Sequence, residues 1–186
     1  MEPFRVLCAD PPWRFDLGTS TKPSKFRGTV DQHYQAMTLA DIKAFEIPTI
    51  LKDSTLILWR VAALLQDALD VAKAWNFVPK AEIVWRKQTK LGNRHFGMGR
   101  QVRMEHETAL ICARGRGAPV KNKSIRSVFD APVGRHSEKP EIFYTEIVEQ
   151  LYDGPYCELF ARRPRPGWLC LGDELAVAET AAEASA

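Results

Sequence analysis

The sequence predicts a single α/β domain built on a mostly parallel central sheet that helices flank. Short apolar runs of strand length alternate along the chain with segments whose apolar residues recur at helical spacing, as in β-α-β units. The chain has 186 residues, 45% of them hydrophobic, which suffices for a buried core without disulfides or metals. Neither a repeat nor a linker divides it, so we expect one domain over residues 1–175 and a flexible tail over residues 176–186.

The first half of the chain contains three predicted strands and two predicted helices. Residues 4–9 (FRVLCA) form an apolar strand that ends where two prolines follow, because proline cannot extend a central strand. Residues 14–33 are polar and lack periodicity, so we expect a long loop there. Thr38 is a suitable N-cap for a short helix that ends near Phe45. A strand, a helix and a second strand are then expected at residues 54–59, 62–75 and 81–85.

The second half places basic loops between short apolar segments. Residues 87–103 and 114–126 are the predicted loops, and the apolar run 108–113 between them is a predicted strand. Pro140 suits the first turn of a helix that runs to about Leu151. Two more strands are expected, near residues 128–129 and over residues 156–161. Ligands of such sheets bind beyond the carboxyl ends of the strands, so the residues that follow each strand are candidates for a site.

The positive charge of the chain is unevenly distributed. The formal net charge is only +3, yet the segment from Arg86 to Arg126 holds eleven basic residues and two acidic ones, an excess of nine. A second, smaller basic group lies in the early loop. Either this is a solvated basic face or it is a surface that binds a polyanion. The charge pattern alone leaves both interpretations open.

Cysteine usage and hydropathy indicate a protein of a reducing compartment. The four cysteines, at positions 8, 112, 157 and 170, lack CxxC spacing, so we expect buried or half-buried free thiols. No apolar run is long enough for a membrane span, and the N-terminus has no secretory signal pattern, so we expect a cytoplasmic protein. The histidines lack carboxylate or cysteine partners at ligand spacing, and no metal site is predicted.

The tetrapeptide Asp10-Pro11-Pro12-Trp13 directly follows the first predicted strand. Its two prolines stiffen the backbone and offer no N–H, so the Asp10 carboxylate and the Pro11 carbonyl are left as acceptors beside a flat indole. Two acceptors next to an aromatic plate suit an amino group attached to a flat ring. Hydrogen bonds to both protons of such an amine free its lone pair for attack on an electrophile. The alternative is a strand-ending turn with a packed tryptophan.

The chain resembles the MT-A family of adenine methyltransferases, named for the 70-kDa subunit of the mRNA adenine methyltransferase, and in particular its stand-alone bacterial and phage members. The resemblance runs from Cys8 to Glu174 and rests on motifs that share one order. These motifs are ADPPW (9–13), HYQAMTLADI (33–42), LILW (56–59), EIVWRK (82–87), EHETALI (105–111), HSEKP (136–140), ELFAR (158–162) and GWLCLGDE (167–174).

The resemblance implies S-adenosylmethionine (SAM) as methyl donor and the exocyclic amine of adenine as acceptor. It also implies a Rossmann-like methyltransferase fold with permuted motif order, in which the amine-binding motif precedes the cofactor-binding strand. By this match Asp10 and the Pro11 carbonyl hold the target amine, and Pro12 and Trp13 wall the base site. Two further residues match positions beside the substrate, namely Tyr34 and Glu105.

The implied cofactor residues come mainly from the C-terminal part of the chain. Lys139 matches the family lysine that meets the methionine carboxylate of SAM, and Asp10 borders the cofactor as well as the substrate. Arg162, Asp173 and Glu174 match the positions that meet the ribose. The pair Asp173-Glu174 departs from the better-known eukaryotic members, which carry Asn-Gln there.

The function predicted from the sequence is therefore methylation of adenine in nucleic acid, with DNA favoured over RNA. The basic loop would contact phosphates through Lys87, Lys90, Arg94 and Arg100. Two alternatives stay open: a catalytically silent, nucleic-acid-binding subunit of the same fold, and a methyltransferase for another amine, such as cytosine or a protein glutamine. The sequence does not distinguish a monomer from a homodimer.

Overall fold

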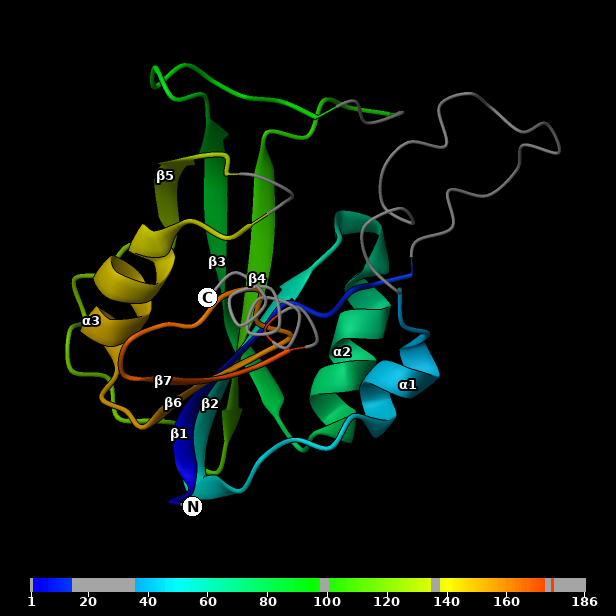
Figure 1. Cartoon of the computed structure of the whole chain (residues 1–186), viewed down its shortest axis with the longest axis vertical. Coiled ribbons are helices and arrows are strands. Elements are labelled where there is room, and N and C mark those ends of the chain that lie inside the picture. Colours follow the sequence, from blue (N-terminus) through cyan, green and yellow to red (C-terminus); the bar gives the residue numbers. More distant parts are fainter. Residues whose placement is uncertain (1, 15–35, 98–100, 135–137, 173–174, 176–186) are drawn as a thin grey trace, which may run out of the picture.

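Seven strands form one sheet in the order β5-β3-β4-β2-β1-β6-β7 (Figure 1). The structure is a computed structural model that describes residues 2–14, 36–97, 101–134, 138–172 and 175. All strands run in one direction except β4, which is antiparallel to both of its neighbours, so the predicted mostly parallel α/β sheet is confirmed. The strands are β1 (Phe4–Ala9), β2 (Ile50–Arg60), β3 (Val78–Gln88), β4 (His106–Arg114), β5 (Val128–Pro132), β6 (Tyr156–Leu159) and β7 (Trp168–Leu171).

Helices cover both faces of the sheet, as Figure 1 shows. On one face lie α1 (Leu39–Ala44), the 3-10 turn η1 (Ala62–Leu64) and α2 (Leu65–Ala74). On the other lie the π-helical segment η2 (Phe143–Val148) and the short α3 (Glu149–Leu151) that continues it. Among the described residues, no helix is long and apolar enough to cross a membrane.

The strand β1 is apolar apart from Arg5, because it is buried on both faces. Successive side chains of a strand point to opposite faces. Leu7 accordingly packs in the core beneath α1 and α2, whereas Val6 and Cys8 pack in the core beneath η2. A continuous apolar run is the pattern expected of a central parallel strand. The burial of β1 fixes where its carboxyl end, and with it Asp10, emerges from the sheet.

Most predicted elements are present, and three differ. The helix expected from Pro140 to Leu151 is present, but its middle is the π-helical η2. The strand expected to reach residue 161 ends at Leu159, because Phe160 has φ 60° and turns the chain away. The segment before Asp173, for which no strand was predicted, contains the edge strand β7, which pairs in parallel with β6.

The cysteines are free thiols, as predicted, and three of them, Cys8, Cys112 and Cys157, are buried in the sheet. Burial raises the pKa of Cys112 and of Cys157 to about 12 in each case. Cys170 on β7 is half-buried. Thiols of this kind behave as small apolar side chains.

Candidate active site

The segment Asp10-Pro11-Pro12-Trp13 forms a rigid turn at the carboxyl end of β1. The Trp13 N–H donates to the Pro11 carbonyl at 2.8 Å, and the Met37 N–H donates to the Pro12 carbonyl at 2.9 Å. Met37 immediately precedes Thr38, the N-cap of α1, whose side chain accepts from the Asp41 N–H in a capping box. The turn is therefore held from two sides, and Asp10 is kept at the sheet edge.

The Trp13 ring anchors this turn in the core. Trp13 is only 7% exposed, and its indole N–H donates to the Trp59 carbonyl on β2 at 3.1 Å. The ring packs with residues of β1, α1 and α2, and the role of Trp13 as a wall of the base site stays a prediction. A large aromatic side chain gains more from such burial than from solvent exposure.

Lys139 lies between two carboxylates. Its Nζ is 2.6 Å from Asp10 Oδ2 and 3.1 Å from Glu107 Oε2, and it lies 5.2 Å from the centre of the Trp59 ring. Lys139 is only 7% exposed, so it is not a solvated lysine at a helix end. Buried charges persist in folded proteins when they are paired in this way. Asp10, predicted to border both the target amine and SAM, is thus in direct contact with Lys139, predicted to bind SAM.

The pKa values at this cluster follow from charge pairing. Burial acts to lower the pKa of Lys139, but the charges of Asp10 and Glu107 outweigh it and raise that pKa. Burial acts to raise the pKa of Glu107, but Lys139 and Lys87 outweigh it and lower that pKa. Lys87 Nζ is 2.6 Å from Glu107 Oε1. Lys87, Glu107, Lys139 and Asp10 therefore form one chain of ion pairs that runs from the end of β3 to the end of β1.

Glu107 is the residue of the EHETALI motif that joins this ion-pair chain, and the sequence analysis did not single it out. The predicted residue was Glu105, whose backbone carbonyl accepts from the Lys87 N–H at 2.7 Å. The Arg86 guanidinium has a raised pKa chiefly through its hydrogen bond to Asp130 and to a smaller extent through the charge of Glu105. The structure thus places Glu105 near Arg86 and Glu107 against Lys139. The register of the antiparallel pair β3·β4 decides which of the two glutamates lies against Lys139, and a single motif does not encode that register.

Replacing Glu107 with glutamine is expected to make the free energy of unfolding depend less on pH in the acidic range. A depressed carboxyl pKa contributes stability above the unfolded pKa, near 4.3, and that contribution is lost as the pH falls through the folded value. The Glu107→Gln variant should lose about 1.5–3 kcal/mol at pH 7, the scale of a hydrogen bond to a charged group. Its stability and that of the wild type should converge at low pH.

Urea unfolding at a series of pH values measures this difference. Glu105→Gln, two residues earlier on the chain, is the matched control and should follow the wild-type curve. If the free energy of unfolding fell equally with pH in Glu107→Gln and in the wild type, the Glu107 carboxylate would not be stabilised by its two lysines.

A second buried polar cluster lies on β6 and the helix beside it. The Tyr144 hydroxyl donates to Glu158 Oε1 at 2.6 Å, and Arg165 donates to Glu158 Oε2 at 3.4 Å. The Arg165 guanidinium stacks on the Tyr144 ring at 3.3 Å from its centre, and it also pairs with Glu141. Burial raises the pKa of Glu158, although Tyr144 and Arg165 oppose this. Sequence reasoning did not assign these side chains, although Glu158 opens the ELFAR motif.

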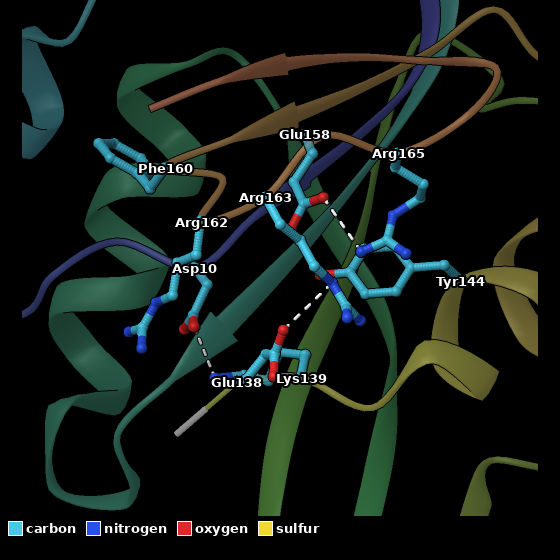
Figure 2. Close-up of a pocket in the computed structure, with 9 residues that line it drawn as sticks. All are labelled: Asp10, Glu138, Lys139, Tyr144, Glu158, Phe160, Arg162, Arg163 and Arg165. Atoms are coloured by element: carbon cyan, nitrogen blue, oxygen red, sulfur yellow. Dashed lines mark hydrogen bonds and ion pairs between the residues drawn. The ribbon is translucent and has the colours of Figure 1, made fainter. Parts of the chain in front are cut away.

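Asp10 and Lys139 of the first cluster and residues of the second cluster line one small pocket that is partly open to solvent (Figure 2). Figure 2 shows Asp10 and Lys139 pointing toward each other on one side of it. Arg162, predicted to bind the cofactor, lines the pocket with Phe160. The other lining residues are Glu138, Tyr144, Glu158, Arg163 and Arg165. The predicted site residues Tyr34, Arg100, Asp173 and Glu174 lie outside the described residues.

The pocket combines cations and carboxylates in a way that fits a small zwitterionic molecule. Lys139 and the arginines suit a carboxylate, whereas Asp10 and Glu158 suit cationic groups. Arg165 Nε is buried and has no hydrogen-bond partner among the residues that the structure describes. A buried donor of this kind is costly unless a ligand or water satisfies it. The donor set therefore fits a ligand with both a carboxylate and positive charge.

The predicted phosphate-binding residues divide into two groups. Lys87 is paired with Glu107 and contributes to the ion-pair chain, so its assignment to phosphate binding is not favoured. Lys90 and Arg94 are exposed on the connection between β3 and β4, and neither has an ion-pair partner within the described part of the chain. On the described part of this connection, Lys90 and Arg94 thus offer charge for a polyanion.

Comparisons with known proteins identify the family of this chain. The model of the MT-A70 family matches residues 4–174. The chain is 23% identical over 180 residues to the type II methyltransferase M.MunI of Mycoplasma sp, which covers 89% of this chain and 75% of that protein. It is 26% identical over 189 residues to the human N(6)-adenine-specific methyltransferase METTL4, which covers 92% of this chain but only 37% of METTL4. Because the family match spans nearly the whole sequence, this chain belongs to the MT-A70 family of adenine methyltransferases.

Proposed function

We propose that this methyltransferase transfers a methyl group from SAM to the exocyclic amine of adenine in nucleic acid, and that DNA is preferred over RNA. The observation that carries the proposal is the Asp10–Lys139 ion pair, at 2.6 Å, inside the pocket at the carboxyl ends of β1 and β6. It joins the residue suited to the acceptor amine with the residue suited to the cofactor. Ligands of parallel sheets bind at this end.

Asp10 and the Pro11 carbonyl are the groups that orient the amine. The Pro11 carbonyl accepts from the Trp13 N–H, and its second lone pair can still accept from the amine. The amine becomes positively charged as the new carbon–nitrogen bond forms, and the negative charge of Asp10 stabilises that charge. Rigid support of the turn by Met37 and Trp59 keeps both acceptors in place without reorganisation.

SAM, when bound, supplies the methyl group on an electrophilic sulfonium. Lys139 and an arginine of the pocket would hold its carboxylate, and Glu158 would face its ammonium group. Arg162 would meet the ribose, together with Asp173 and Glu174 as the family resemblance implies. Tyr144 and Arg165 hold the Glu158 carboxylate through two hydrogen bonds, which fixes its orientation toward the ligand.

The assignment of adenine as the target base rests on the family of this chain and on the relatives to which the chain is similar. The name of METTL4 specifies the N6 amine of adenine, and the type II methyltransferase of Mycoplasma is a bacterial relative. A silent subunit is less well supported, because both Asp10 and Lys139 are present in one formed pocket. Methylation of cytosine or of a protein glutamine is an outcome that the product analysis distinguishes.

The test is incubation with labelled SAM and matched single- and double-stranded DNA and RNA of mixed sequence. The products are digested to nucleosides and separated. N6-methyladenine in DNA is the expected product. Label in RNA adenine alone would overturn the DNA preference, and label in cytosine or in protein would overturn the assignment of the acceptor.

The exposed cations beyond β3 give a salt-dependence prediction. Each neutralised phosphate of duplex DNA contributes about −0.9 to the slope of log binding constant against log salt. The double variant Lys90→Ala/Arg94→Ala is therefore expected to reduce that slope by about 1.8 and to raise the substrate KM, with SAM affinity unchanged. Binding at several salt concentrations measures it.

The matched control is Lys52→Ala/Lys80→Ala, which removes two cations at the amino ends of β2 and β3. This pair is expected to leave the slope unchanged. Equal effects of the two double variants would mean that the polyanion is held by overall charge and not by the connection between β3 and β4.

A further inference from the structure

The connection between β3 and β4 begins with a hydrogen-bonded turn that exposes the side chain of Leu91. We call its described residues, 89–97 and 101–105, the β3–β4 arm; Figure 1 shows it extending beyond the end of the sheet. At the tip the Gly92 N–H donates to the Thr89 carbonyl at 2.9 Å, and the Thr89 N–H donates to the Asn93 carbonyl at 2.7 Å. The Asn93 N–H also donates to the Thr89 hydroxyl at 3.2 Å. This turn presents Leu91, which is 87% exposed.

The exposure of Leu91 is part of a local pattern. Three of the seven exposed large hydrophobic side chains of the described residues lie on the arm, namely Leu91, Phe96 and Val102, and Leu91 is the most exposed of all seven. Hydrogen bonds of the backbone and of the Thr89 hydroxyl close the turn. Gly92 has φ 78°, a backbone conformation that residues with a side chain rarely adopt. The fold therefore presents Leu91 in a defined place without using it for packing.

The arm emerges at the same end of the sheet as the active site. The strands β3 and β1 run in one direction, since β4 is antiparallel to both β2 and β3, so their carboxyl ends share an edge. The base of the arm is tied to the site through Lys87, Glu107 and Lys139. Lys90 and Arg94 flank the tip with two positive charges. The arm thus presents an apolar side chain between two cations, and its base is connected to the residues suited to a base amine. A nucleic acid duplex matches this arrangement, because it has apolar stacked bases between two phosphate backbones.

We propose that Leu91 is a wedge that enters the base stack of duplex nucleic acid as the target adenine leaves it. This inference rests on the proposed function. A base stacked inside a duplex cannot bring its amine to Asp10 at the sheet edge, so it must be extruded at a cost of a few kcal/mol. Leucine is one of the apolar side chains that proteins insert between base steps, and Lys90 and Arg94 would hold the phosphates on either side. Leu91 acts by positioning the substrate and has no part in the methyl transfer itself.

The test compares one nucleic acid in two forms, using the full-length protein. The polymer is the one that the wild type methylates, of mixed sequence, supplied as a duplex and as separated strands. Leu91→Ala is expected to lower kcat/KM on the duplex about 10-fold or more, because the cost of extrusion is no longer offset. On separated strands kcat/KM should stay within about two-fold of wild type, since an unstacked base needs no wedge. Leu91→Met, which keeps the bulk, should restore duplex activity.

The matched control is Val78→Ala, which truncates a side chain that is 57% exposed at the opposite end of β3. It should leave both activities unchanged. Three outcomes would overturn the wedge while the proposed function stands. In the first, Leu91→Ala loses the same activity on the duplex and on separated strands; in the second, it loses none on either. In the third, the wild type methylates only separated strands. A change of oligomeric state in Leu91→Ala with equal losses would instead make the tip a contact between copies of the chain. Absence of any adenine methylation by the wild type would overturn the proposed function itself.

Discussion

Replacing Asp10 with asparagine is expected to lower turnover by about 100-fold or more while SAM still binds. The substitution keeps the shape of the side chain but removes the negative charge that faces the developing positive charge on the amine. Loss of one preorganised group that stabilises transition-state charge costs about 100- to 1000-fold in turnover. Lys139 keeps its second partner, Glu107, at 3.1 Å, so the pocket retains its cation.

Methyl transfer and calorimetric SAM binding, measured in parallel, test this expectation. Asp53→Asn is the matched control, because Asp53 is also an ion-paired carboxylate but lies at the far end of β2 with Arg116. That variant should retain turnover. Near-normal turnover of Asp10→Asn would remove Asp10 from the catalytic step.

Replacing Lys139 with methionine is expected to weaken SAM and to destabilise the fold together. Loss of a hydrogen bond to a charged group corresponds to about 1.5–3 kcal/mol of SAM affinity, and S-adenosylhomocysteine should weaken to the same extent because both carry the carboxylate. The substitution also takes the Lys139 charge away from Asp10 and leaves Glu107 paired with Lys87 alone. Breaking a buried pair by removing one partner costs about 3–5 kcal/mol of stability.

A double variant separates the two effects. Lys139→Met/Asp10→Asn removes the carboxylate that has lost its cation, so it should recover part of the lost stability but none of the SAM affinity. Denaturant unfolding and calorimetry are the measurements. Unchanged affinity for both ligands in the single variant would restrict Lys139 to a structural role.

The sequence predicted the two ends of the ion-pair chain but not its middle. Asp10 was found because it follows an apolar strand, and Lys139 was found by resemblance to the family. Glu107 was missed because its place depends on the antiparallel insertion of β4 between β2 and β3, and strand direction is not written in a local pattern. The neighbouring Glu105 was equally plausible on composition alone.

The fold shows the same division between local and long-range information. The cap at Thr38 and the strand β1 were predictable because each is specified by adjacent residues. The edge strand β7 was not, since it is only four residues long and depends on β6 and on the stacking of Trp168 on Tyr156 at 4.7 Å. The packing of the Trp13 ring could not be predicted for a related reason: its indole N–H partner, the Trp59 carbonyl, lies 46 positions away in the chain.

The buried thiols of the sheet give this protein internal reporters of strand separation. Only the thiolate reacts with alkylating reagents, and a thiol of pKa about 12, as in Cys112 and Cys157, is ionised in roughly one molecule in 10⁵ at pH 7. Modification therefore has to wait for the surrounding strands to open, so its rate measures an opening equilibrium. Cys112 lies on β4 and Cys157 on β6, on opposite sides of β1. The ratio of their labelling rates thus compares the opening of the two halves of the sheet in an unaltered protein.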